Sequence, residues 1–298
     1  MFATVLDCNG RPLKLDRPRV VGILNVTPDS FSDGGTHADV ASAVAHGLAM
    51  VGQGADMLDV GGESTRPGAA DVTVEDELSR VIPVIEQLVA QTQVPIAVDT
   101  SKPEVMRAAV AAGAGMINDV YALRRDGAVE AAAELGVPVC LMHMQGEPRG
   151  MQSDPHYDDV VGEVHRFLTD RLFACELAGI DRRKVMVDPG FGFGKTVEHN
   201  LALLRALEHF ADLGSGIYVG MSRKSMIGAL TGRTAPLDRV AGSVAAALIA
   251  VQRGALMVRV HDVAATMDVL AVWQGVKAGD TVPRKASKPA APRWPDDD

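Results

Sequence analysis

The feature that most constrains the fold of this chain is a pattern that occurs eight times: an apolar run ends in a polar residue, and a helix-like segment follows. Strand–helix units in this number are typical of an α/β chain that closes into a (β/α)8 TIM barrel. The runs end at Asn25, Glu63, Asp99, Asn118 with Asp119, His143, Asp188, Ser222, and Arg259 with His261. Active sites of such barrels lie at the C-terminal ends of the strands. The sequence therefore predicts one pocket that reads a polar heterocycle and holds an anion.

The barrel is expected to fill residues 1–276 as a single domain, in which residues 1–18 form a hairpin-like cap on the barrel floor. Residues 277–298 lack apolar periodicity and are rich in Pro, Lys, Ala and Asp, which predicts a disordered tail. The alternative for the tail is that Trp294 docks on the barrel.

Two connections stand out by their length. The loops 27–39 and 61–73, which follow the first two strands, are longer than usual βα connections, and long loops on the active face are commonly lids or substrate clamps. Thr73, followed by Asp76, is typical of a helix start. Further helices are expected near 39–53, 157–178 and 262–276, and one is expected to start after Lys102 and Pro103.

Composition excludes several classes of partner. A formal net charge of -9 and an aromatic content of 4% argue against nucleic acid. No membrane span is expected, because the longest apolar stretch, around 240–258, is interrupted by Gln252 and Arg253. The cysteines are odd in number, lie far apart and lack metal-ligand spacing. Without a signal peptide at the N-terminus, the expected compartment is the reducing cytoplasm.

The segment VDPGFGFGK, residues 187–195, resembles a nucleotide-binding loop only superficially. A Walker A loop needs glycine where Pro189 stands, and the strictly alternating glycines do not fit G-x-G-x-x-G. What remains is Asp188, a carboxylate that can accept two parallel N–H bonds from an edge such as that of a pterin. Phe191 and Phe193 would wall an aromatic substrate. The alternative is an Asp that caps a helix, with both phenylalanines in the core.

Two neighbouring strands end in further hydrogen-bonding groups. Asp99 would add an acceptor and Asn118 an amide to the same pocket, since strand ends of a barrel converge on one mouth. The alternative for Asp99 is a cap for the helix that begins after Lys102.

The cationic residues follow the last two strands, where many barrels bind phosphate. Lys224 follows the seventh strand, and Arg259 with His261 ends the eighth. Arg259 and His261 are two residues apart, so they are expected on one face as an anion clamp. The alternative is a salt bridge from Arg259 to a neighbouring carboxylate.

Asn25 is a candidate Mg²⁺ ligand, because an amide oxygen can hold an ion that bridges a diphosphate. The alternative is an Asn that caps the loop backbone. Thr65 and Arg66 are candidates for binding phosphate or a carboxylate. His143 has no metal-binding partner at local spacing, so we interpret it as a histidine held by hydrogen bonds, with Met142 packing under the ligand.

Taken in order, eight segments of the chain resemble the dihydropteroate synthase family, and they cover the barrel from about residue 19 to 275. They are ILNVTPDSFSDGG (23–35), DVGGESTRPGA (59–69), VDTSKP (98–103), INDV (117–120), MHMQG (142–146), VDPGFGFGK (187–195), GMSRKSMIG (220–228) and VRVHDV (258–263). The resemblance implies a homodimeric transferase. It would condense (7,8-dihydropterin-6-yl)methyl diphosphate with 4-aminobenzoate in a dissociative substitution that needs Mg²⁺ and gives 7,8-dihydropteroate and diphosphate.

The resemblance also implies a role for each matching residue. Diphosphate and Mg²⁺ would be held by Asn25, Thr65, Arg259 and His261. The pterin edge would be read by Asp99, Asn118 and Asp188, in a slot shaped by Met142, Phe193 and Gly220. Lys224 would meet the pterin carbonyl side and border the 4-aminobenzoate site, where Arg66, Pro67 and Ser225 act.

Three other functions remain open alternatives. A pterin-dependent methyltransferase-type barrel would share the pterin edge but would not need the segments STRPG and SRKS. A non-catalytic pterin-binding paralogue would be expected to lack residues such as Asn25, Arg66, Lys224 or His261, and all four are present. A purely structural barrel is disfavoured by the polar strand ends.

Overall fold

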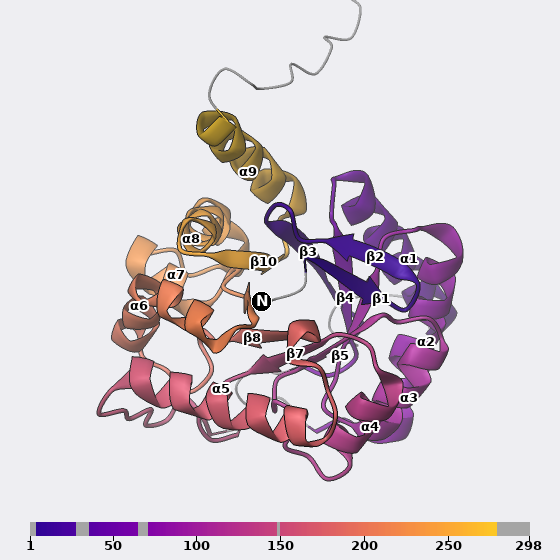
Figure 1. Ribbon diagram of the computed structural model, residues 1–298. Helices are drawn as coiled ribbons and strands as arrows, with labels where there is room; N and C mark the ends of the chain where they lie inside the picture. Colours follow the sequence, from indigo (N-terminus) through magenta and orange to yellow (C-terminus); the bar gives the residue numbers. More distant parts are fainter. Residues whose placement is uncertain (1–3, 28–35, 65–70, 148–149, 279–298) are drawn as a thin grey trace, which may run out of the picture.

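A computed structural model describes residues 4–27, 36–64, 71–147 and 150–278. Eight parallel strands close into a barrel in the order β10-β3-β4-β5-β6-β7-β8-β9, with helices arranged around them (Figure 1). The predicted TIM barrel is therefore confirmed. The strands are β3 (Arg19–Asn25), β4 (Met57–Gly61), β5 (Ile96–Asp99), β6 (Met116–Asp119), β7 (Val139–Met142), β8 (Val185–Asp188), β9 (Gly216–Val219) and β10 (Ala255–Val260).

The helices alternate with these strands, as the sequence pattern predicts. They are α1 (Thr36–Gly52), α2 (Val74–Gln91), α3 (Pro103–Ala111), α4 (Ala128–Leu135), α5 (Val160–Leu177), α6 (Val197–Arg205), α7 (Ser225–Thr231), α8 (Val240–Gln252) and α9 (Val263–Ala278). Short 3-10 turns accompany them: η2 (Arg182–Lys184), η3 (Leu207–Leu213) and η4 (Pro236–Arg239).

Local chemistry explains several helix starts. The Thr73 hydroxyl accepts a hydrogen bond from the Asp76 backbone N–H at 3.1 Å, so Thr73 is the N-cap of α2, as predicted. Helix α3 begins at Pro103, whose fixed φ suits the first turn. The Thr196 hydroxyl and the His199 side chain form a reciprocal capping box at the start of α6.

The N-terminal end of the barrel is closed by an antiparallel hairpin of β1 (Val5–Cys8) and β2 (Arg11–Lys14). Its buried side chains Leu6, Cys8 and Leu13 belong to one cluster with residues near the beginnings of the barrel strands. This cluster contains Leu6, Cys8, Leu13, Leu15, Val21, Met57, Ala97, Met116, Cys140, Met186, Tyr218 and Met257. The hairpin therefore covers the N-terminal end of the barrel and shields its interior from solvent.

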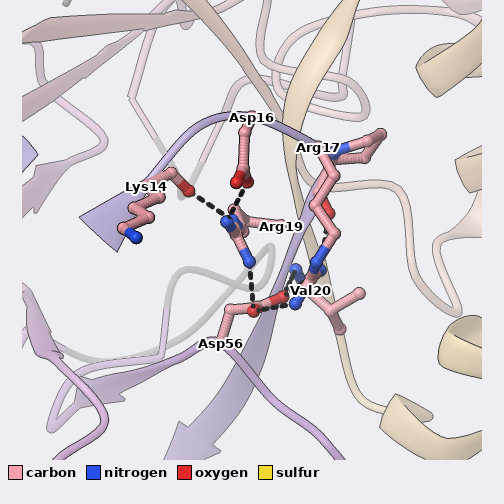
Figure 2. A network of polar contacts seen from close by, with 7 residues as sticks. Lys14, Asp16, Arg17, Arg19, Val20 and Asp56 are labelled. Atoms are coloured by element: carbon pink, nitrogen blue, oxygen red, sulfur yellow. Dashed lines mark hydrogen bonds and ion pairs between the residues drawn. The ribbon is translucent and has the colours of Figure 1, made fainter. Parts of the chain in front are cut away.

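A charged network ties the segment after the hairpin to the barrel (Figure 2). Asp56, just before β4, accepts two hydrogen bonds from Arg17, one from Arg19 and one from the Val20 backbone N–H, all between 2.6 and 3.0 Å. Arg19 also donates to Asp16 and to the Lys14 carbonyl oxygen. Both oxygens of Asp56 are therefore satisfied by protein donors, which is typical of a structural role.

Some predictions fall outside the described residues, namely the tail from residue 279, Trp294 and most of the first long loop. Within the described ranges, no single helix is both long and apolar enough to cross a bilayer. One pair, Ser225–Thr231 with Pro236–Gln252, meets the length and composition criteria only when joined, and it is bent by 76°.

Candidate active site

The positions of the site residues follow from the apolar cluster at the N-terminal end of the barrel, because the same strands continue from that cluster to the site. Side chains two residues apart on a strand face the same side of the sheet, so the residues two positions beyond those of the cluster form the next layer inside the barrel. This layer consists of Ile23, Asp59, Asp99, Asn118, Met142, Asp188, Gly220 and Arg259. An apolar layer is therefore followed directly by a layer with three carboxylates, an amide and a guanidinium.

Arg259 on β10 crosses the barrel to the carboxylates of β4 and β5. Its Nε donates to Asp59, and its Nη2 donates to Asp99 at 2.7 Å. Asn118 Nδ2 donates to the same Asp59 oxygen, Oδ2, at 2.9 Å. The salt bridge considered as an alternative for Arg259 is thus present, and Asp99 pairs with arginine rather than capping α3. The carboxylates raise the pKa of Arg259 further, against the effect of burial.

Asp59 is completely buried, and its Oδ1 has no hydrogen-bond partner among the residues that the structure describes. An unpaired buried carboxylate oxygen is costly. At the C-terminal ends of barrel strands, where substrates bind, such an atom indicates that a donor from a ligand or an ordered water belongs there. Asp59 was missed as a site residue from the sequence.

Asp188 and Lys224 are two further charged residues of the site, and each affects the pKa of the other. Burial raises the pKa of Asp188 to about 6, opposed first by Lys224. Burial lowers the pKa of Lys224 to about 8, opposed first by Asp188. Asp188 accepts the Gly190 backbone N–H at 2.8 Å and does not cap a helix, because α6 begins at Val197. Burial also raises the pKa of Asp99, to about 7, although Arg259 opposes the rise.

Apolar side chains lie next to Lys224 in the candidate site. Met142 and Phe193 belong to a buried cluster with Val120, Met144 and Met151. The Lys224 ammonium lies 4.3 Å from the centre of the Phe193 ring, a cation–π contact. Phe191, by contrast, is fully buried in the main core, so only one of the two phenylalanines borders the site.

The strand ends above this layer carry the remaining predicted groups. His261 lies just beyond β10, and its Nδ1 is 3.0 Å from the Ser222 hydroxyl. Ser225 is exposed at the start of α7, directly after Lys224. Asn25 is the last residue of β3 and is half-buried. In the described part of the chain, no three His, Cys, Asp or Glu side chains are grouped to hold a metal.

Thr65, Arg66 and Pro67 lie outside the described residues, but both ends of their loop are described. The Glu63 carboxylate contacts the Lys102 ammonium at 2.5 Å through Oε2, and its Oε1 accepts the Val72 backbone N–H at 3.4 Å. Lys102 also contacts Glu77 at 2.5 Å. Glu63 therefore links the first described residues after this loop, at Val72, to Lys102 on the following βα connection.

The remaining predicted histidine behaves as expected. His143 is buried, and its Nδ1 lies 2.9 Å from the Lys195 ammonium. Burial lowers its pKa to about 2, with Lys195 adding to the effect, so the ring is neutral. His143 is thus a hydrogen-bonded structural histidine.

Comparison with known proteins agrees with this geometry. Residues 21–261 match the family described as pterin binding enzyme. Dihydropteroate synthase of Escherichia coli K12 is 54% identical over 267 residues, which are 90% of this chain and 94% of the relative. The Xanthomonas albilineans dihydropteroate synthase solved with 4-aminobenzoic acid is 65% identical, with a TM-score of 0.89 and coverage of 94% of this chain and 100% of that one. The chain belongs to the dihydropteroate synthase family.

A further structure of the Xanthomonas albilineans dihydropteroate synthase, in complex with 7,8-dihydropteroate, is 62% identical, with a TM-score of 0.84 and coverage of 94% and 100%. Membership of the dihydropteroate synthase family confirms the resemblance read from the eight segments. The roles of individual side chains stay predictions. To them the geometry adds Asp59, which is bonded to two of the predicted residues, Asn118 and Arg259.

Proposed function

We propose that this chain condenses (7,8-dihydropterin-6-yl)methyl diphosphate with 4-aminobenzoate to give 7,8-dihydropteroate and diphosphate. The observation that carries the proposal is the polar layer within the barrel. It places carboxylates and an amide beside the cations Lys224 and Arg259, over an apolar floor. Family membership supports the same reaction.

The order of bond changes follows from the substrate. The C–O bond between the methylene carbon and the diphosphate breaks first, because the electron-rich dihydropterin stabilises the resulting cation. The amine of 4-aminobenzoate then forms the C–N bond, and its proton leaves to solvent. The protein's main contribution is to hold the ring and to stabilise the departing negative charge.

Recognition of the pterin is proposed for Asp99, Asn118 and Asp188, in the slot bordered by Met142 and Phe193. With a pKa of about 6, Asp188 is mostly ionised at neutral pH. An ionised carboxylate can accept two parallel N–H bonds from the pterin edge. The mixed charges of the layer suit a heterocycle that presents donors and acceptors along one edge.

The departing diphosphate would meet Arg259 and His261. Nε and Nη2 of Arg259 are held by Asp59 and Asp99, while Nη1 makes no hydrogen bond with the described residues. This arrangement fixes the guanidinium and leaves one of its nitrogens available for an anion.

Asn25 would hold Mg²⁺, which would neutralise charge on the diphosphate. Asn25 lies two residues beyond Ile23 on β3 and so belongs to the same inward face, one layer above the polar layer. Mg²⁺ usually keeps several waters and uses few protein ligands besides substrate phosphates. A single amide at the mouth therefore fits this ion, although it would not fit a fully protein-bound metal.

For 4-aminobenzoate, we propose Lys224 and Ser225 together with Arg66 and Pro67. Ser225 follows Lys224 directly and is exposed, so it can meet the second substrate after the pterin is bound. The site would thus fill from the barrel interior outwards.

The decisive experiment gives the purified protein the dihydropterin diphosphate and Mg²⁺, with and without 4-aminobenzoate. We expect equal amounts of diphosphate and 7,8-dihydropteroate with both substrates. Lys224→Ala should weaken the binding of both substrates while the protein stays folded. Pterin binding without either product would instead support the non-catalytic paralogue.

We also propose a homodimer. Large apolar side chains are exposed on α7 to α9 and on η4, namely Leu230, Leu237, Ile249, Val272 and Val276. Exposed large apolar side chains of this kind are frequent at protein interfaces. Sedimentation analysis should give a dimer for the wild type and a monomer for Leu237→Asp. A wild-type monomer would contradict the proposal.

A reducing, cytoplasmic compartment is proposed from the cysteines. Cys8, Cys140 and Cys175 are all free and buried. Burial raises the pKa of each thiol, so none is activated as a thiolate.

A further inference from the structure

Lys195, which ends the segment VDPGFGFGK, has no role in the reaction proposed above. Its side chain does not reach the pocket, because its ammonium is buried inside the loop between β8 and α6. Nζ contacts the Gly190 carbonyl oxygen at 2.9 Å, the Phe193 carbonyl oxygen at 3.0 Å and His143 Nδ1 at 2.9 Å. A lysine ammonium has three N–H donors, so three acceptors at these distances satisfy it.

The loop is shaped to fold around this ammonium. Gly190 and Gly194 have positive φ angles of 72° and 61°. A Cβ on Gly190 would lie 1.8 Å from the His143 carbonyl oxygen, and one on Gly194 would lie 2.5 Å from the Gln145 carbonyl oxygen. The loop therefore presses against the chain after β7, and only glycine allows both the turns and this approach.

The outer side of the same loop holds Lys224. Lys224 Nζ donates to the Phe191 carbonyl oxygen and lies over the Phe193 ring. The carbonyl oxygens at 190 and 193 point to Lys195, whereas that at 191 points to Lys224. One short segment thus separates a buried lysine from a lysine of the candidate active site.

We propose that Lys195 is a positioning residue that fixes Lys224 by holding the loop on which the Lys224 ammonium rests. The inference depends on the proposed function, because it assumes that Lys224 binds substrate. Without Lys195, the Phe193 carbonyl oxygen and the His143 nitrogen lose their donor, and the Gly190 carbonyl oxygen keeps only the Phe193 backbone N–H at 3.1 Å. The loop must then rearrange to satisfy these buried acceptors. Lys224 would then lose the carbonyl and the ring that orient it.

A double-mutant cycle tests this coupling. Lys195→Met retains the approximate length of the side chain but removes its donors, and Lys224→Met removes the proposed substrate contact. We expect Lys195→Met to lower kcat/KM for the dihydropterin diphosphate by about 10- to 100-fold, the range expected when buried acceptors lose their donor. In the Lys224→Met background the same change should have little further effect, because the contact it serves is already absent.

The control is Thr196→Ala, next in the chain. It removes the N-cap of α6 and should lower stability, which thermal melting measures, but it should act independently of Lys224→Met. Wild-type kinetics in Lys195→Met, or losses that simply multiply in the double variant, would overturn the proposal. If Lys195→Met does not fold, Lys195→Gln, which retains two N–H donors but is shorter, takes its place in the cycle, and a loss that multiplies with that of Lys224→Met would overturn the proposal.

The wild type separates this inference from the proposed function. If the wild type forms no dihydropteroate, the proposed function fails. If it does, and the effects at 195 and 224 multiply, only the positioning role of Lys195 fails.

Discussion

Both ends of the barrel contain a network of arginine and aspartate side chains around a largely buried carboxylate, and the two networks differ in how completely this carboxylate is hydrogen-bonded. At the N-terminal end, Asp56 receives four hydrogen bonds, three from arginines and one from the backbone (Figure 2). At the C-terminal end, Asp59 receives bonds only at Oδ2, while Oδ1 is buried and has no partner among the described residues.

The presence of an arginine–aspartate network therefore does not by itself distinguish a structural site from a functional one. Buried charges that protein donors fully satisfy are typical of structure. The network at the C-terminal end has an unpaired oxygen and lies near Asp188 and Lys224, whose pKa values are shifted towards neutrality. Such shifts cluster at functional sites.

The largest effect on this comparison should come from Asp188→Asn. It should weaken binding of the pterin by about 2–5 kcal/mol, because the proposed pterin contact loses its buried, charged acceptor. Titration calorimetry with the dihydropterin measures the loss. Asp181→Asn, at an exposed ion pair with Arg183, is the matched control and should bind as the wild type does. Near wild-type affinity in Asp188→Asn would remove Asp188 from the proposed pterin site.

Asp56→Ala, at the N-terminal end of the barrel, should lower stability and leave KM unchanged. We expect a loss of about 2–3 kcal/mol in the free energy of unfolding, because two arginines lose their carboxylate. The value is below that for a fully buried pair, since the Arg17 side chain is 35% exposed. Denaturant unfolding measures it, and Asp16→Ala, at a mostly exposed carboxylate, is the control. A changed KM in folded Asp56→Ala would contradict a purely structural role.

The barrel and most of the candidate site residues are predictable from the sequence, because strand ends and helix starts have local sequence signals. Thr73 and Pro103 mark the starts of α2 and α3 as predicted. Asp99, Asn118 and Asp188 are the polar residues at the ends of their strands, so the end of each apolar run located them.

No such local signal marks Asp59, Lys195 or the ion pairs that Lys102 makes with Glu63 and Glu77. The run MLDVGGE was read to Glu63, whereas β4 ends at Gly61 and its inward polar residue is Asp59. The register that pairs Gly61 with Asp99 is a property of the closed sheet. Asp59 could have been identified by counting two residues beyond Met57 along β4, just as Asp99 lies two residues beyond Ala97 along β5. The inward direction of Lys195 depends on the positive φ angles of the glycines, which no spacing rule gives.

The pH dependence of catalysis tests the role of Lys224 at the C-terminal end of the barrel. Its pKa is lowered to about 8, so the ammonium is lost as the pH rises through this value. We expect kcat/KM for the dihydropterin diphosphate to fall above that pH by about tenfold per unit. Lys224→Arg should move this limb to higher pH, because a guanidinium stays protonated. Asp188→Asn should move it lower, because the carboxylate favours the charged lysine. An alkaline limb that neither variant moves would rule out Lys224 as its origin.

The smallest effect tests whether a polar residue at the catalytic end has to be functional. Thr73 caps α2 at this end of the barrel and satisfies the Asp76 backbone N–H. Thr73→Ala should cost about 1 kcal/mol of stability, the usual value for a lost N-cap, with kcat unchanged. Ser79→Ala, at an exposed serine one turn further along α2, should leave both stability and kcat near the wild type. A fall in kcat without a fall in stability would show that Thr73 acts on the site. In that case the functional residues at the C-terminal end of the barrel would include a helix N-cap as well as the buried charged residues.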